Sequence, residues 1–211
     1  MEHGSFADSK NKRGPMLRLI LETCSNPGSW ALSRQGEILA SGTCQGTVTA
    51  SLIPSLQQSF PHDLKPEQIL VGVGPGSFSG IRSGIASAEG MAAIWHCPVI
   101  PLRSTGSIAW RYPEVPMLGV FSDARRGDFF ATYYAHGKLE RPTTVYPMQE
   151  LPELLGRCTL AVTTDSLPGI KTQEKPQAHN LAAYLHAHGL EPGLSLEPIH
   201  LRPALAVPTS S

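Results

Sequence analysis

The chain has 211 residues, with 17 basic and 17 acidic side chains and a formal net charge of +0. This length suffices for one medium domain or two small lobes with a buried core. A basic excess or a basic run is absent, which argues against a protein that holds nucleic acid by charge alone. No stretch approaches about 18 apolar residues, so we expect no membrane span. Residues 1–15 lack the apolar region of a secretory signal, and we expect a disordered extension there.

The four cysteines indicate a reducing compartment. Cys24, Cys44, Cys97 and Cys158 are widely spaced and form no C-x-x-C pair. A disulfide framework in a secreted domain would be denser, so we expect reduced thiols and a cytoplasmic protein.

Three antiparallel strands are predicted at the start. Residues 16–22 and 29–34 are β-compatible runs, and Gln35–Gly36 connects the second run to residues 37–41 as a hairpin turn. A helix over residues 47–60 follows. Its apolar residues recur every fourth position, at Val48, Leu52, Leu56 and Phe60. Pro54 predicts a kink, or a helix that starts late.

Strands and helices then alternate. We expect a buried strand at residues 69–73, a helix at 79–96, a short strand at 99–101 and a helix at 104–110 with a serine N-cap. Further strands are expected at 117–121, 129–134 and 159–163, and helices at 148–155 and 178–188. This order predicts an α/β fold with two lobes. The first lobe covers residues 16–105, with part of the C-terminal helix joined to it, and residues 106–211 form a second, smaller lobe.

A glycine loop joins the predicted strand at 69–73 to the helix at 79–96. Its sequence, Gly74-Pro75-Gly76-Ser77, allows positive φ and places backbone N–H groups where they could face an anion. The Walker sequence Gly-Lys-Ser/Thr is absent, and Pro75 breaks the dinucleotide-binding order. Two interpretations remain open at this stage, a structural tight turn and a cradle for a phosphate or a partner.

The helix after this loop carries a stripe of small residues, Gly80, Gly84, Ala88 and Ala92. Glycine inside a helix costs about 1 kcal/mol relative to alanine, so a close contact must compensate. The stripe packs either on its own sheet or on a helix of another subunit, as in a four-helix bundle. The partner or dimer interface expected from the second interpretation comprises Val48, Leu52, Leu56, Gly80, Ile81, Gly84, Ile85, Ala88, Met91, Ala92 and Trp95.

A second polar motif, Asp123-Ala124-Arg125-Arg126-Gly127-Asp128, lies between two predicted strands. Adjacent arginines can hold a phosphate or a carboxylate, although a solvated turn with internal ion pairs explains the same residues. The residues considered for a nucleotide or anion site are Glu22, Gly74, Gly76, Ser77, Arg82, Asp123, Arg125 and Arg126.

Several of these segments together resemble the TsaB (YeaZ) family. They are LILETCSNPGSWAL, ASLIPSLQQSF, GVGPGSFSGIRSGIASAEGMA and SDARRGDFFATYY, and they span about Met16 to Tyr134. The resemblance implies the two-lobed actin/Hsp70/sugar-kinase-like fold, with mixed sheets flanked by helices. It also implies a non-catalytic scaffold or activating subunit for the synthesis of threonylcarbamoyladenosine in tRNA.

The same resemblance suggests the partners. They are a catalytic TsaD-like subunit and a TsaE-like ATPase, with a homodimer when the chain is alone and tRNA contacted only indirectly. No cofactor is expected on this chain itself, although ATP could lie at the interface of the complex. The alternative is an ATP-dependent enzyme of this fold, a phosphotransferase or peptidase-like protein, with nucleotide near Glu22, Gly74 and Asp123.

Two departures bear on that alternative. The family usually has I-D-T-S after its first strand, whereas Glu22 stands at the acidic position here. The H-x-x-x-H metal pair of the catalytic relatives is missing, since His186 and His188 are two residues apart and point to different helix faces. We therefore expect no metal site. The serines of the loop lack the G-x-S-x-G setting and an evident histidine base, so a serine hydrolase is not expected.

Overall fold

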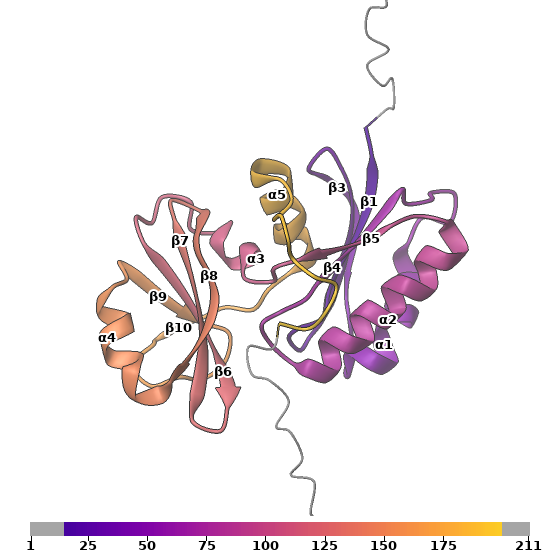
Figure 1. Ribbon diagram of the computed structural model, residues 1–211. Helices are drawn as coiled ribbons and strands as arrows, with labels where there is room; N and C mark the ends of the chain where they lie inside the picture. Colours follow the sequence, from indigo (N-terminus) through magenta and orange to yellow (C-terminus); the bar gives the residue numbers. More distant parts are fainter. Residues whose placement is uncertain (1–14, 200–211) are drawn as a thin grey trace, which may run out of the picture.

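The computed structural model describes residues 15–199, which form two five-stranded sheets (Figure 1). The strand order of the first sheet is β3-β2-β1-β4-β5. Its strands are β1 (Leu17–Glu22), β2 (Ser29–Arg34), β3 (Glu37–Thr43), β4 (Gln68–Gly72) and β5 (Val99–Leu102). β1, β2 and β3 are antiparallel, while β4 and β5 run parallel to β1.

Helices cover both faces of this sheet. Helices α1 (Val48–Ser59) and α2 (Phe78–Trp95) lie on one face, and α5 (Ala178–His188) lies on the other. The alternation of side chains along β1 explains this arrangement, because Leu19 and Leu21 enter the core under α1 and α2, whereas Ile20 packs with α5. A strand buried on both faces needs the continuous apolar run that β1 shows.

The second sheet repeats this topology. Its order is β10-β9-β6-β7-β8, again three antiparallel strands followed by two parallel ones. The strands are β6 (Leu118–Arg125), β7 (Asp128–Ala135), β8 (Lys138–Pro147), β9 (Leu160–Thr163) and β10 (Thr172–Gln173). A 3-10 turn at Met148–Glu150 and α4 (Leu151–Gly156) cover one face, and α3 (Gly106–Ala109) packs on the other, beside α5.

The expected two-lobed α/β architecture and most expected elements are confirmed. Two local details differ from the expectations. Of the two alternatives for Pro54, a kink or a late start, the late start is wrong, because helix α1 already begins at Val48 and contains Pro54 in its interior. The proline leaves the Ala50 carbonyl without its helical donor, and Ala50 is exposed to water. Ser104 does not cap α3, whose N-cap is Thr105. Instead, Ser104 accepts a hydrogen bond from the Gly74 N–H.

Strands β8 and β10 were not anticipated. β8 lies at the edge of its sheet, exposes half of its residues and contains Pro142, so it shows neither a continuous apolar run nor a clear alternation. β10 has only two residues. Among residues 15–199, we find no helix whose length and apolarity would let it cross a membrane.

Candidate functional site

The glycine loop between β4 and α2 packs closely against the segment after β1. A Cβ at Gly76 would lie 2.4 Å from the Cys24 carbonyl oxygen, and one at Gly74, whose φ is +96°, would lie 2.7 Å from Ile81 Cδ1. Both positions therefore require glycine for reasons within the chain itself.

Several N–H groups of this loop already have acceptors in the chain. Ser77 donates its N–H to the Cys24 carbonyl at 2.7 Å, and Gly74 donates to Ser104 Oγ at 3.1 Å. At the start of α2, Ser77 Oγ caps the helix by accepting the Gly80 N–H at 3.3 Å. These contacts favour the tight-turn interpretation of the motif, because an anion would have to replace existing hydrogen bonds to use the same donors.

Glu22 is sealed beneath the loop. Its side chain is 0% exposed, and its Oε1 accepts the Cys24 N–H at 2.9 Å. A Cβ at Gly72 would lie 2.1 Å from Glu22 Oε2, so β4 can pass this carboxyl only with glycine at that position. Burial raises the pKa of Glu22, and burial together with the nearby Glu22 carboxyl raises the pKa of the Cys24 thiol. Glu22 thus has a structural role, because it holds the segment at Cys24 on which the loop packs.

The Asp-Ala-Arg-Arg motif forms the end of the β6–β7 hairpin. Arg125 and Arg126 both have positive φ, at 66° and 56°, and Gly127 follows with φ 82°. Arg125 donates from Nη1 to Asp123 Oδ2 at 2.9 Å, and Asp165 Oδ2 accepts the Asp123 N–H at 3.0 Å. The turn with an internal ion pair that the sequence allowed is present in this hairpin.

The loop and the hairpin face each other across a cleft of about 630 Å³ between the lobes. Four of the eight residues considered for an anion site, Gly76, Ser77, Asp123 and Arg125, line this cleft. Glu22, Gly74, Arg82 and Arg126 are not in its lining. Arg82 instead lies over the ring of Phe78, with its guanidinium carbon 5.3 Å from the ring centroid.

The cleft also contains residues that the sequence did not single out, chiefly Phe130, Thr164, Asp165 and Lys175. Asp165 follows β9, and its position just beyond a strand next to β6 was the one signal that could have revealed it. Glu22 and Asp123, considered as an acid pair, do not share the cleft. Within residues 15–199 there is no cluster of three or more His, Cys, Asp or Glu side chains suited to a metal ion.

The residues considered for a partner interface face mainly inward. A Cβ at Gly80 would lie 2.2 Å from the Thr23 carbonyl oxygen, and one at Gly84 would lie 2.2 Å from Thr23 Oγ1. The other buried members of the set are Val48, Leu52, Leu56, Ile81, Ala88 and Ala92, while Ile85, Met91 and Trp95 are half-buried. The stripe of small residues therefore holds α2 against its own sheet.

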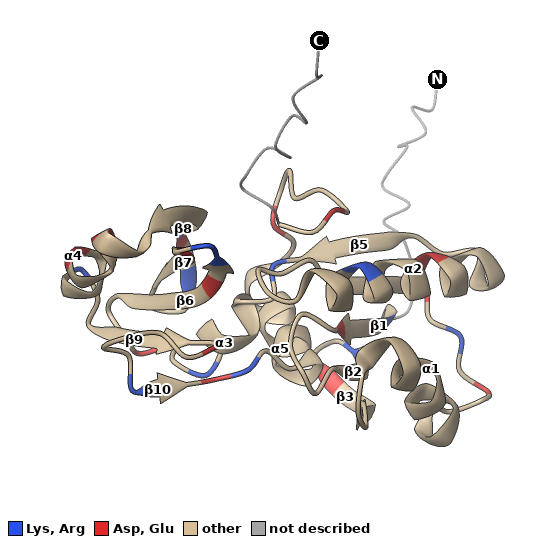
Figure 2. Ribbon diagram, turned by 90° about the horizontal axis from the view of Figure 1, so that it is seen from below, with Lys and Arg blue, Asp and Glu red and all other residues tan. Residues whose placement is uncertain are grey.

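The opposite side of the same two helices is exposed and mostly apolar, with Arg82 and Glu89 of α2 as its charged residues. We call this surface the outer face, and it comprises Ala50, Ile53 and Pro54 of α1 and Ala86, Gly90, Ala93 and Ile94 of α2. Ile94 is 74% exposed and Ile53 is 42% exposed. α1 carries no charged side chain, as Figure 2 shows. Thr49 and Ser83 share a hydrogen bond of 2.8 Å that ties the two helices together.

Comparisons with known proteins show similar folds and one matching family. The family of TsaD, tRNA N6-adenosine threonylcarbamoyltransferase, matches residues 52–144. YeaZ from Pseudomonas aeruginosa has a TM-score of 0.66 and 21% identity, over 88% of this chain and 100% of that chain. A structure from the same organism, described as an uncharacterized protein with similarity to peptidase YEAZ, has a TM-score of 0.63 and 20% identity, over 89% of this chain and 100% of that chain. The resemblance to YeaZ proteins is thus confirmed, and the chain has the two-lobed α/β fold of these structures.

Proposed function

We propose that this chain is a non-catalytic subunit of the cytoplasmic system that makes threonylcarbamoyladenosine in tRNA, and that it binds a TsaD-type catalytic subunit through the outer face. The observation that carries the proposal is the exposed apolar surface on α1 and α2, which includes Ile94, 74% exposed near the end of α2. Contiguous exposed apolar residues in a soluble fold mark a surface that another protein covers.

The composition of the outer face suits a helical partner. Alanine and glycine on α2 let another backbone approach closely, while Ile53 and Ile94 supply apolar area. A Cβ at Gly90 would meet nothing within 4 Å among residues 15–199, so no contact in this part of the chain explains this glycine inside a helix. A partner helix seated at Gly90 would provide the missing compensation for its low helix propensity.

The other partners follow from the same proposal. The free chain would cover its outer face by forming a homodimer. The TsaD-type subunit would then take the place of the second copy on that face. A TsaE-like ATPase would join the resulting complex, with ATP at an interface and tRNA held by the other subunits. No cofactor is assigned to this chain.

The alternative, an ATP-dependent enzyme with nucleotide in the cleft, has weaker support. The acid that would face the phosphates, Glu22, is fully buried beneath the loop. Three N–H groups of the loop and helix start are bonded within the chain. In the cleft, Arg125 is paired with Asp123. An anion would therefore have to compete with groups of the protein itself.

Reconstitution tests the proposal. We expect the purified chain to form a stable complex with a TsaD-type protein from the same organism, detected by light scattering. We also expect tRNA threonylcarbamoylation to require both proteins and to be absent with this chain alone. The proposal is wrong if no complex forms and the modification proceeds equally well without this chain. Metal-dependent ATP turnover by the isolated chain would instead support the enzyme.

A further inference from the structure

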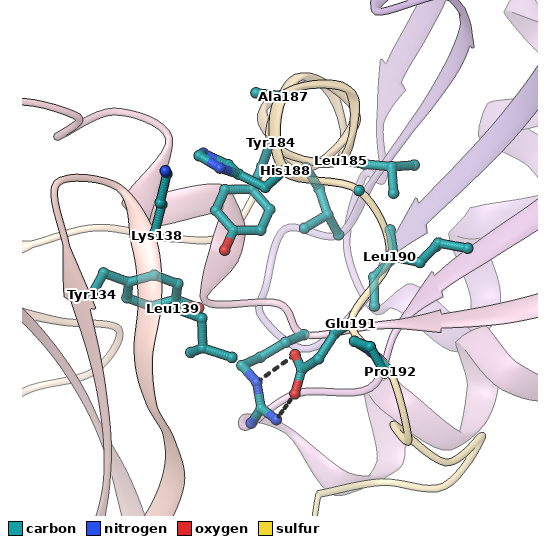
Figure 3. Close-up of a pocket in the computed structure, with 14 residues that line it drawn as sticks. Tyr134, Lys138, Leu139, Tyr184, Leu185, Ala187, His188, Leu190, Glu191 and Pro192 are labelled. Atoms are coloured by element: carbon teal, nitrogen blue, oxygen red, sulfur yellow. Dashed lines mark hydrogen bonds and ion pairs between the residues drawn. The ribbon is translucent and has the colours of Figure 1, made fainter.

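A second cavity, of about 430 Å³, lies between the lobes at the opposite end of α5 from the loop that enters this helix. Its walls come from β7 and β8, from the last turns of α5, and from residues 189–192 (Figure 3). Tyr134 and Tyr184 form an aromatic wall, with ring centroids 6.1 Å apart in an edge-on arrangement. Five of the other twelve lining residues are leucines. The volume lies in the usual range for small-molecule sites, about 300–1,000 Å³.

At the base of this cavity, a buried arginine holds a carboxylate. The Arg103 side chain is only 9% exposed. Its Nε donates to Glu191 Oε2 at 2.9 Å, and its Nη2 donates to Glu191 Oε1, which gives a bidentate pair. On the other side, Arg103 Nη1 donates to Thr143 Oγ1 of β8 at 2.5 Å. Thr143 in turn is hydrogen-bonded to Thr132 at 2.8 Å, so the guanidinium is positioned independently of Glu191.

Glu191 belongs to a loosely tied segment. Gly189, with φ +78°, ends α5 and donates its N–H to Leu185. The next backbone hydrogen bond to another part of the chain joins Ile199 to Val73, and residues 190–198 form no helix or strand. Further along this segment, Leu196 packs against the core between the first sheet and helices α1 and α2. The pair with Arg103 is therefore the main polar attachment at the start of this segment, and Glu191 can leave without breaking a helix or a sheet.

The charges around the cavity favour an anion. Among its fourteen lining residues, Glu191 is the only acid, while Arg103 and Lys138 are cationic. Once Glu191 withdraws, a desolvated guanidinium faces an apolar and aromatic space, which is the setting in which arginine recognises a carboxylate.

We propose that this cavity binds a small organic carboxylate with an apolar or aromatic body, whose carboxylate replaces that of Glu191 on Arg103. Tyr134, Tyr184 and Leu139 contact the body of the ligand. In the absence of ligand, Glu191 occupies the guanidinium of Arg103. Because the ligand must displace Glu191, this competition lowers the affinity of the cavity for the ligand.

Phenylacetate is a suitable probe, and its neutral amide, phenylacetamide, is the matched control. We expect the full chain to bind phenylacetate at millimolar concentration in an NMR titration, with shifts centred on Leu139 and Tyr184, and to bind phenylacetamide at least tenfold more weakly. The Glu191→Gln variant should bind phenylacetate at least tenfold more tightly, because its amide competes less well for the guanidinium. Glu153→Gln, which removes an exposed acid paired with Arg157, should leave the affinity unchanged.

Leu139→Trp tests the cavity without altering the ion pair. The larger ring fills the space from β8, so we expect phenylacetate binding to be lost while the thermal midpoint stays within a few degrees of that of the wild type. The proposal is overturned if the wild type does not bind phenylacetate at millimolar concentration. It is also overturned if phenylacetamide binds as well as phenylacetate, or if folded Glu191→Gln protein shows unchanged affinity.

Discussion

The two sides of helix α2 contain glycine for opposite reasons. On the inner side, Gly80 and Gly84 let the helix lie directly on the segment after β1, where a Cβ would meet Thr23 atoms at 2.2 Å. On the outer side, Gly90 has open space around it. Inner glycines thus serve folding, whereas an exposed glycine in the middle of a helix costs stability without an internal benefit. A stripe of small residues on a helix therefore indicates a partner protein only when it lies on the side that faces away from the helix's own sheet.

The largest effect is expected on the inner side. Gly84→Leu would force a side chain into Thr23 and separate α2 from its sheet, so we expect the free energy of unfolding to fall by about 3 kcal/mol or more. Urea denaturation followed by circular dichroism measures the loss. A variant of wild-type stability would show that α2 is not held against β1 in the way described.

The corresponding change on the outer side should affect binding instead. Gly90→Leu replaces glycine by a better helix former in open space, so we expect stability to rise by about 0.5–1 kcal/mol. The bulky side chain should weaken the complex with a TsaD-type protein by more than tenfold, or about 1.4 kcal/mol. Calorimetry gives the affinity. Undiminished binding would remove Gly90 from the interface.

Glu22, beneath the loop beside the inner side, should make stability depend on pH. Its pKa is raised by burial in the folded chain, so its contribution to stability is fully present below the pKa of the unfolded chain and is lost as pH rises through the folded pKa. Glu22→Gln removes this titration. Above about pH 4.5, we expect the plot of unfolding free energy against pH to be flatter for this variant than for the wild type. Parallel plots for the two proteins would contradict the attribution of this pH dependence to Glu22.

The smallest effect is expected at Thr23. Its Oγ1 is buried beside Gly84 and has no hydrogen-bond partner in the part of the chain that the structure describes. Thr23→Val keeps the shape and removes a buried polar atom that is not satisfied, so we expect stability to stay equal or to rise by up to about 1 kcal/mol. Thermal unfolding checks this, and a clear loss of stability would mean that the hydroxyl has a partner in solution.

The regular elements of the first lobe were predictable because their patterns are local. The apolar run of β1 and the spacing of Val48, Leu52 and Leu56 each report burial within one element. The helix expected at residues 178–188 was predicted for the same reason and is α5. Strand β8 escaped prediction because its buried and exposed residues do not alternate regularly, and such predictions depend on that alternation.

The candidate site was less predictable because it is assembled from distant segments. The motif at residues 74–77 and the motif at residues 123–128 were recognised separately, yet Asp165 and Lys175 reach the same cleft through sheet topology that no local pattern encodes. Periodicity likewise reveals that Gly80, Gly84, Ala88 and Ala92 form one stripe, but what covers the stripe depends on where Thr23 lies in the folded chain.

The most direct test is the affinity of a TsaD-type protein for two matched variants, measured by calorimetry. Ile94→Glu places a charge on the outer face, and Leu39→Glu places one at an exposed position of strand β3, outside the outer face. We predict that Ile94→Glu weakens the complex by more than tenfold while the unfolding free energy changes by less than about 0.5 kcal/mol, and that Leu39→Glu binds like the wild type. Equal affinities for the two variants would contradict the assignment of the outer face as the partner surface.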